Sequence, residues 1–492
     1  MSFAVLNGTW PHLGVVAAAL LAACAILSRD DVLRAWSMLG AMVLACALLL
    51  ADVWHSSQLG VIRRHAPEAV VGAIVVLAAL AVLAHLIYRR PQLAALLTVL
   101  TLPGRIPISV GGNTSNLLLP LYFVVAASAL AWLVPTLWRA HGARDLPPPA
   151  RRPPRHAFEW LLAAYIVLYA LQALYSVNFR TALQNEVFFY VPFAVMLALL
   201  RDLDWSRRLL LRCLGLTVVL ALAFALFGFV QELTHTLILN SGLYYANQLH
   251  EYFQINSIFF DPNIFGRYLA LTMVLLVALM LYDRRPRVAL GAIVTLAVLW
   301  GCLIFTLSRS SLAALALGMA VLAALRWRVR PVLYLAAVVI VAGAVTLAVR
   351  PRTFGLNQGF NGASSGRASL IAGGIKMFAE KPIVGWGAGS FESEYRVQFP
   401  ESARNNVPDS HDIPVTVASE QGVVGLLVYL GLVIPAIITL LRGARGDPFR
   451  VAVAATFLAL LLHTLFYADF LEDPVTWTLL AIGGALAAAA QA

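Results

Sequence analysis

Apolar residues follow one another in runs of about 15–24 residues, a length of helix that crosses a bilayer, and short polar clusters separate the runs. Because lipid offers no hydrogen-bond partners, each run predicts a helix that satisfies its own backbone. The runs lie at 12–28, 36–52, 69–88, 117–138, 158–175, 187–200, 209–232, 264–282, 287–307, 311–325, 332–349, 421–441, 450–467 and 474–490. A shorter run at 91–102 is either a full span or a half-helix. We expect an all-α, polytopic transmembrane helical bundle of about 12–15 spans.

Composition supports this fold class. Hydrophobic residues make up 61% of the 492 residues and charged residues only 12%, whereas a soluble domain has roughly 25% charged residues. A signal peptide would account for 12–28 alone and leave the later runs unexplained. All four cysteines lie inside apolar runs and none has metal-ligand spacing, so neither a disulfide framework nor a metal site is expected.

Arginines predict the orientation of the spans. The net charge is +11, but the arginines flank apolar runs, so they indicate topology rather than nucleic-acid binding. The basic linkers are 139–156, 201–208, 283–287, 326–330 and 442–450. An even number of spans separates each linker from the next, which places all five on the cytoplasmic side. The side of the N-terminus depends on whether 91–102 spans, and Arg63 and Arg64 do not fit the alternation.

The remaining polar segments then lie outside. They are 103–116, 176–186, 233–263, 308–310, 350–420 and 468–473. The longest divides the chain into N-terminal spans with short loops (1–349), a long outer loop (350–420) and three C-terminal spans (421–492). The loop is too short for a separate domain but long enough for a few short helices, and we expect it to carry catalytic residues.

Outer arginines run against the positive-inside bias and need another explanation. They are Arg105, Arg180, Arg267, Arg309, Arg350, Arg352, Arg367, Arg396 and Arg404. Guanidinium groups bind phosphate oxygens bidentately and stay charged when desolvated, so an anionic substrate at the outer interface would account for them. The alternatives are headgroup contacts, snorkelling and structural ion pairs.

Two predicted helix starts contain some of these arginines. Asp261-Pro262-Asn263 predicts a helix start, with Asp261 as cap and Pro262 in the first turn; alternatively, Asn263 and Arg267 contact substrate. An apolar stripe with helical spacing predicts another helix that opens at Arg367 and ends at Lys381-Pro382. A cation is unfavourable at a helix N-terminus, and an anion bound jointly by Arg367 and the free N–H groups would remove the conflict.

The glycines of 382–391 lack a βαβ context, so they predict a tight turn with an exposed backbone rather than a nucleotide loop. His411 lies in the outer loop and is the side chain best suited to general-base work near neutral pH. The alternative is an ordinary surface histidine. His85 and His463 fall inside spans, where we expect packed core residues.

These elements in order resemble the O-antigen ligase and polymerase superfamily of bacterial membrane glycosyltransferases. The matching segments are Asp261-Pro262-Asn263 through Arg267, Ser308-Arg309-Ser-Ser-Leu312, Arg367 through Phe391, and His411-Asp412 with Glu420-Gln-Gly422. Residues 250–490 carry the resemblance, and the first 250 residues agree only as spans. The family usually has Asn after the histidine, and Asp412 departs from that pattern.

The resemblance implies transfer of a glycan from undecaprenyl pyrophosphate to an acceptor hydroxyl at the periplasmic face of the bacterial inner membrane. His411 would act as base, Arg309 and Arg367 would hold the pyrophosphate, and inversion without a metal or cofactor is expected. Other substrate contacts are expected from Arg267, Asn263, Arg180, Asp412 and Glu420. The acceptor would be lipid A–core for a ligase or a second lipid-linked glycan for a polymerase. A flippase or transporter is the rival, but carboxylates near mid-span are nearly absent from the sequence.

Overall fold

The computed structural model describes residues 8–53, 66–110, 113–140, 155–238, 240–248, 252–283, 285–327, 329–334, 367–400, 409–467 and 469–491. Its helices are α2 (Thr9–Leu27), α3 (Asp31–Val53), α5 (Ala66–Arg89), α6 (Gln92–Thr101), α7 (Leu119–Ala140), α8 (Ala157–Ala173), α9 (Phe179–Asn185), the π-helix η1 (Glu186–Tyr190), α10 (Val191–Arg201), α11 (Arg207–Thr234), α12 (Ser241–Gln248), α13 (Pro262–Tyr282), α14 (Pro286–Phe305), α15 (Arg309–Arg326), α18 (Arg367–Glu380), α19 (Phe391–Gln398), α20 (Ile413–Leu441), α21 (Pro448–Thr464) and α22 (Pro474–Ala489). Strands β1 (Ile106–Val110) and β2 (Asn113–Leu117) form an antiparallel hairpin.

The predicted polytopic helical bundle is confirmed. Ten of the described helices are long and apolar enough to cross a membrane, and α6, α8, α21 and α22 are shorter apolar helices. In the described part of the chain, the hairpin β1–β2 is the only regular secondary structure that is not helical. Most of the predicted run 332–349 and the boundary at 349/350 lie outside the described residues, as do Arg63, Arg64, Arg350, Arg352 and Arg404.

One predicted loop is helical. Residues 176–186 were expected outside the membrane, but α9, η1 and α10 continue from Phe179 to Arg201 as one candidate span. The predicted run 187–200 is the second part of this span. The polar residues Asn185 and Glu186 hid its first part from the hydropathy pattern, because this wall of the bundle faces a polar interior. Glu186 is fully buried there, so the expectation that carboxylates are nearly absent within spans has an exception.

One end of the bundle gathers the basic linkers. Arg201 contacts Gly484 near the end of α22, and Arg155 lies 3.5 Å from Asp202. Arg34, near the start of α3, also pairs with Asp202. We call this end, defined by these residues, the basic end. The predicted linkers 139–156 and 201–208 therefore meet on one side.

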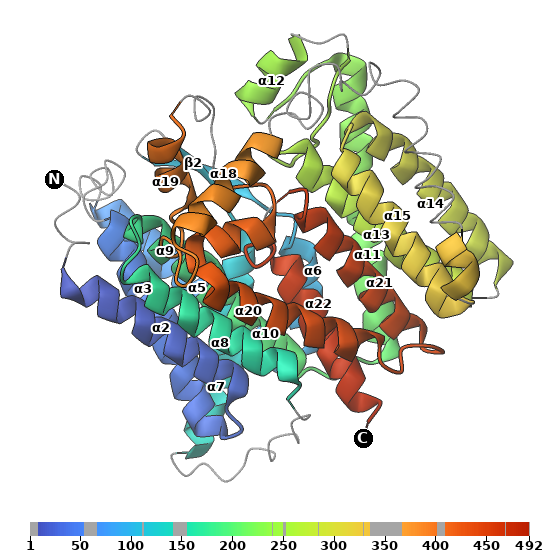
Figure 1. Ribbon diagram of the computed structural model, residues 1–492. Helices are drawn as coiled ribbons and strands as arrows, with labels where there is room; N and C mark the ends of the chain where they lie inside the picture. Colours follow the sequence, from blue (N-terminus) through green and yellow to red (C-terminus); the bar gives the residue numbers. More distant parts are fainter. Residues whose placement is uncertain are drawn as a thin grey trace.

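Helix α6 has 10 residues and is about 15 Å long, which is too short to cross a bilayer core by itself. It begins at the basic end, where Arg212 near the start of α11 donates to Gln92 at 3.5 Å, and Arg105 follows its last turn. Helix α3 also runs away from the basic end, because Asp52 near its end pairs with Arg180 of α9 at 2.7 Å. Arg34 near the start of α3 donates to the carbonyl of Ala25 near the end of α2, so α2 ends at the basic end and starts at the opposite end. Figure 1 shows α12, α18 and α19 at one end of the bundle and the C-terminus at the other.

Helix α20 is broken at Gly422, whose φ of 66° and ψ of −165° are not helical. A break frees backbone groups that must find partners inside the bundle. The N–H of Trp386 donates to the carbonyl of Ser419 at 3.2 Å, and the N–H of Gly387 donates to that of Glu420 at 2.8 Å. The segment between α18 and α19 therefore completes the hydrogen bonding of the broken helix.

The exposed glycine turn predicted at 382–391 is wrong. Gly385, Gly387 and Gly389 have left-handed φ values of 69°, 98° and 67°, but their backbone is buried. A Cβ on Gly385 would lie 2.3 Å from the carbonyl carbon of Glu420, and one on Gly387 would lie 2.3 Å from the Cα of Ser176. Glycine is needed here because two backbones touch.

His85 also departs from expectation. It was predicted in the core, but it lies on the exposed face of α5. Helix α5 is the least buried of the candidate spans, with only 11% of its apolar window inside the protein. Its apolar residues therefore belong to the outer surface of the bundle rather than to its core.

Candidate functional site

Four segments meet at the end opposite to the basic end. They are the starts of α13 and α18, the segment 409–412 before α20, and the segment 465–473 between α21 and α22. Ion pairs, ring contacts and charge interactions join them, as described below. We call this group of segments the site.

His411 lies in the short segment before α20. Its φ of 58° is unusual for a residue with a side chain and indicates a constrained backbone. Its N–H donates to Asp409 Oδ1 at 2.6 Å, and its Nδ1 lies 3.5 Å from the same oxygen. Burial and the positive charge of Arg367 lower the pKa of His411 from its usual value. The imidazole is therefore neutral near pH 7 and able to accept a proton.

Arg367 is the first residue of α18, where the sequence placed it. Its charge acts on His411, and it partly offsets the burial that raises the pKa of Asp409. The structure therefore brings together Arg367 and His411, which are separated by 44 positions in the sequence. A positive charge at a helix N-terminus has no favourable interaction with the dipole, so this position suits a bound anion.

Arg267 is buried one turn into α13 and forms a 2.6 Å ion pair with Asp473, the cap of α22. Its buried Nη1 has no hydrogen-bond partner in the described part of the chain. A buried guanidinium group that keeps a free N–H donor is costly unless something else accepts the bond. Arg267 therefore has both a structural partner and spare capacity for an anionic ligand.

Helix α13 starts as the sequence predicted, with the Asp261 side chain accepting the N–H of Asn263 at 2.6 Å. The amide oxygen of Asn263 accepts from the Ser308 hydroxyl at 2.8 Å. This bond ties the start of α13 to the start of α15, which begins at Arg309. The Arg309 side chain is exposed, and within the described residues no ion pair or hydrogen bond joins it to Arg367 or His411.

His463 is buried near the end of α21, as predicted. Its Nε2 lies 3.2 Å from the Ser310 hydroxyl and 3.3 Å from the Ser311 hydroxyl. Its ring also lies 5.8 Å from Tyr467, whose ring is 6.1 Å from His411. His463 therefore packs behind the site rather than facing it.

Three further predicted binding residues have protein partners. Asp412 caps α20 by accepting the N–H of Val415 at 3.0 Å. Glu420 accepts the N–H groups of Gly389 and Phe391 at 2.9 Å and 2.8 Å. Arg180 pairs with Asp52, lies 45% exposed, and lines neither of the cavities described next.

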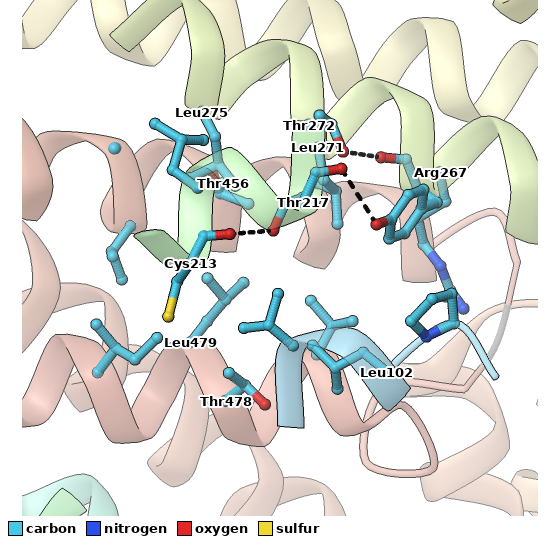
Figure 2. A pocket seen from close by; sticks show the side chains of 18 of the residues that line it. Leu102, Cys213, Thr217, Arg267, Leu271, Thr272, Leu275, Thr456, Thr478 and Leu479 are labelled. Atoms are coloured by element: carbon cyan, nitrogen blue, oxygen red, sulfur yellow. Dashed lines mark hydrogen bonds between the residues drawn. The ribbon is translucent and has the colours of Figure 1, made fainter. Parts of the chain in front are cut away.

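An apolar cavity of about 160 Å³ leads away from the site. Its walls come from α6, α11, α13, α21 and α22, and Figure 2 shows leucines of α13 and α22 around it, with Arg267 at one end. Arg105 and Asp473 also line it. An apolar channel that ends at arginines matches a ligand with a hydrocarbon chain and an anionic head.

A second, polar cavity of about 260 Å³ lies on the other side of Arg105, which lines both. Tyrosines of α8 and η1 form one wall, and Asp409, Glu420, Asp469 and Glu472 contribute carboxyl groups. Sequence reasoning missed Asp409, Asp469 and Glu472, although the outer segment 468–473 contains three acidic residues. Among the described residues, no group of His, Cys, Asp and Glu side chains is arranged to hold a metal ion.

Residues 294–430 match the family model described as O-antigen ligase. The matched segment includes Arg309, Arg367, His411 and Glu420. No curated protein matches the chain at a significant level. The match supports the resemblance to the O-antigen ligase and polymerase superfamily within residues 294–430, which make up less than half of the chain.

Proposed function

We propose that the chain transfers a glycan from undecaprenyl pyrophosphate to an acceptor hydroxyl, as an O-antigen ligase does. The observation that carries this proposal is the apolar cavity that ends at Arg105 and Arg267 within the site that holds His411. The polyprenyl chain would lie along the apolar wall. The pyrophosphate would then lie among the arginines, beside the base.

Each residue has a role in one displacement. The acceptor oxygen attacks the anomeric carbon and forms the new glycosidic bond, while the bond from that carbon to the pyrophosphate oxygen breaks. His411 takes the proton from the acceptor hydroxyl. Arg267 and Arg367 hold the charge that develops on the departing pyrophosphate, and Arg309, exposed at the start of α15, is the third cation assigned to it. A single displacement inverts the anomeric centre, and none of these steps uses a metal.

The site end of the bundle would face the periplasm, because the basic linkers gather at the other end. The three-part organisation into 1–349, 350–420 and 421–492 then has a functional meaning. The long segment supplies Arg367 and His411, and the flanking spans supply Arg267 and the cavity walls. In a Gram-negative inner membrane this arrangement would meet lipid-linked glycans after they are translocated.

A reconstituted assay tests the proposal. The purified chain is incubated in proteoliposomes with an undecaprenyl-pyrophosphate-linked glycan and lipid A–core. We expect transfer that survives EDTA and is lost in His411→Ala and Arg367→Ala. Arg396→Gln is the matched control, because Arg396 is an exposed arginine that pairs with Glu392. Full activity of His411→Ala or Arg367→Ala would overturn the assigned roles.

The same assay separates the alternatives. A polymerase would extend the glycan on its lipid carrier, so the product would remain attached to undecaprenyl pyrophosphate. A transporter would move labelled lipid-linked glycan across the liposome membrane without forming a glycosidic bond. Inhibition by EDTA with recovery on adding a divalent cation would overturn the metal-independent mechanism.

A further inference from the structure

The polar cavity has a composition that the donor lipid does not explain. It lies beyond Arg105, away from the apolar walls, and it is enclosed by α8, η1, the start of α20 and the segment 469–472. Its volume of about 260 Å³ is close to the small end of ligand-binding cavities, which begin at roughly 300 Å³. A cavity of this size admits one or two sugar rings rather than a lipid chain.

Tyrosines supply the flat surfaces of this cavity. Tyr165, Tyr169, Tyr190 and Tyr429 line it, and the rings of Tyr169 and Tyr190 meet edge to face at 4.7 Å. The hydroxyl of Tyr169 accepts from Asn185 at 2.8 Å. Rings held in this way present apolar faces with polar rims, the combination that matches a sugar ring.

Carboxyl groups dominate the polar part of the wall. The lining contains five carboxyl groups, from Glu392, Asp409, Glu420, Asp469 and Glu472, and one guanidinium group, from Arg105. Glu420 has two backbone donors, whereas no hydrogen bond from another described residue reaches the side chains of Asp469 and Glu472. These two carboxyl groups are therefore available to a ligand.

The carboxyl groups of this cavity lie close together, and some of them are protonated near neutral pH while others are ionised. Burial, and then repulsion from Asp469, raise the pKa of Asp409 to about 7 and that of Glu472 to about 8. Protonated and ionised carboxyl groups therefore coexist near neutral pH. A protonated carboxyl group donates a hydrogen bond and an ionised one accepts, so the wall can pair with hydroxyl groups, which do both.

We propose that the polar cavity is a subsite for an uncharged sugar residue of the glycan substrates and that Asp469 and Glu472 exclude sugars that carry a carboxylate. The proposal rests on the proposed function only in naming the glycan as the source of the sugar. A uronic acid would add a negative charge to a wall with five carboxyl groups and one guanidinium group. Its carboxylate would be repelled by the carboxyl groups that are ionised and would have to keep the others protonated. A neutral ring with hydroxyl groups meets no such penalty.

Binding of two matched disaccharides tests this inference without any donor lipid. The full chain in nanodiscs is titrated at pH 7.5 with cellobiose and with cellobiouronic acid, which differ by one carboxylate, and binding is followed by saturation-transfer NMR. We expect cellobiose to bind at least about tenfold more tightly, a ratio that corresponds to one strong like-charge contact. The double variant Asp469→Asn/Glu472→Gln should reduce the ratio to near one.

Matched controls keep the test interpretable. Glu380→Gln removes an exposed carboxylate of α18 that lines neither cavity, so it should leave the ratio unchanged. Tyr169→Phe keeps the ring and removes one hydroxyl group, and it should weaken cellobiose binding. Equal binding of the two sugars, binding of neither, or an unchanged ratio in the double variant would each overturn the inference.

The source of the sugar is read from the transfer assay. A rise in KM for the acceptor alone in the double variant places the acceptor glycan in the cavity, and a rise for the donor alone places the donor glycan there. If no transfer is found with any donor, the proposed function fails, but selective binding of cellobiose still supports the subsite. If transfer is normal and binding is unselective, only the subsite fails.

Discussion

Asp409 holds His411 through the backbone: its Oδ1 accepts the His411 N–H at 2.6 Å and lies 3.5 Å from the ring Nδ1. This bond fixes a residue whose φ of 58° is unfavourable for a side-chain-bearing residue. The same carboxyl group lines the polar cavity. One acidic side chain therefore connects the proposed base to the proposed sugar subsite.

Asp409 should therefore act as a positioning residue. In Asp409→Ala the backbone bond is lost, and we expect kcat to fall by about tenfold or more, a fraction of what general-base catalysis contributes. Asp409→Asn keeps an oxygen that accepts the His411 N–H, so it should recover most of the activity. Steady-state kinetics in proteoliposomes measure both. Equal losses in the two variants would show that the charge, and not the bond, is what matters.

The charge of Arg367 should set the pH dependence. Because burial and this charge lower the pKa of His411, its neutral form dominates at pH 7, and kcat/KM should fall only on the acid side of the usual histidine range, near 6.5. Arg367→Gln removes a charge that disfavours the imidazolium ion. The pKa of His411 then rises, and the acid limb of the residual activity should move to higher pH.

A pH–rate profile of kcat/KM for wild type and Arg367→Gln measures that shift. Arg396→Gln removes a charge from the exposed face of α19 and should leave the acid limb in place. An acid limb that moves to lower pH in Arg367→Gln, or that also moves in Arg396→Gln, would contradict a specific interaction between Arg367 and His411.

The glycine contacts predict a sharp difference between two similar substitutions. In Gly387→Ala the new Cβ would lie 2.3 Å from the Cα of Ser176, at a φ of 98°. Because the atoms that the new Cβ would meet include backbone atoms of Ser176, they cannot move away easily. We therefore expect the free energy of unfolding to fall by several kcal/mol, on the scale of overpacking plus backbone strain. Gly291→Ala, where a Cβ meets nothing within 4 Å, should change stability by about 1 kcal/mol or less, because alanine favours helix.

Thermal unfolding in detergent micelles compares the two variants. Gly387→Ala should unfold well below the wild type, and Gly291→Ala at or above it. If Gly387→Ala is as stable as Gly291→Ala, the close contact between the 382–391 segment and Ser176 is not a feature of the folded protein.

Local patterns explain which parts of the site were predictable. Capping chemistry and spacing predicted the starts of α13 and α18, because a helix start depends on a few consecutive residues. Two other contacts join segments that are far apart in the sequence, so no local pattern predicts them. They are the ion pair of Arg267 with Asp473 and the charge interaction of Asp409 with Asp469. In the sequence, Asp409, Asp469 and Asp473 can be recognised only as acidic residues of outer segments.

Two errors have a common physical cause. The first part of the span through Glu186 looked like a loop, and 382–391 looked like an exposed turn, because polar residues and glycines normally indicate solvent. Here the interior itself is polar, and glycines allow the 382–391 segment to satisfy the break in α20. Hydropathy identifies segments that face lipid, so it is least informative where a membrane protein builds its site.

The last prediction concerns Asp412, the N-cap residue of α20. The Asp412 carboxylate accepts the N–H of Val415 at 3.0 Å, a role that asparagine performs equally well. Burial raises the pKa of Asp412, so a neutral amide avoids a desolvation cost. Capping therefore accommodates either aspartate or asparagine at position 412, and Asp412→Asn should retain full activity and stability.

Asp412→Ala distinguishes this explanation from a direct role in catalysis. It removes the cap and should cost about 1 kcal/mol, with a modest loss of activity that follows the loss of folded protein. Thermal unfolding and transfer rates, measured on the same preparations, separate the two effects. If Asp412→Asn is as stable as the wild type but inactive, the carboxylate itself acts on His411 or on a substrate, and capping does not explain its presence.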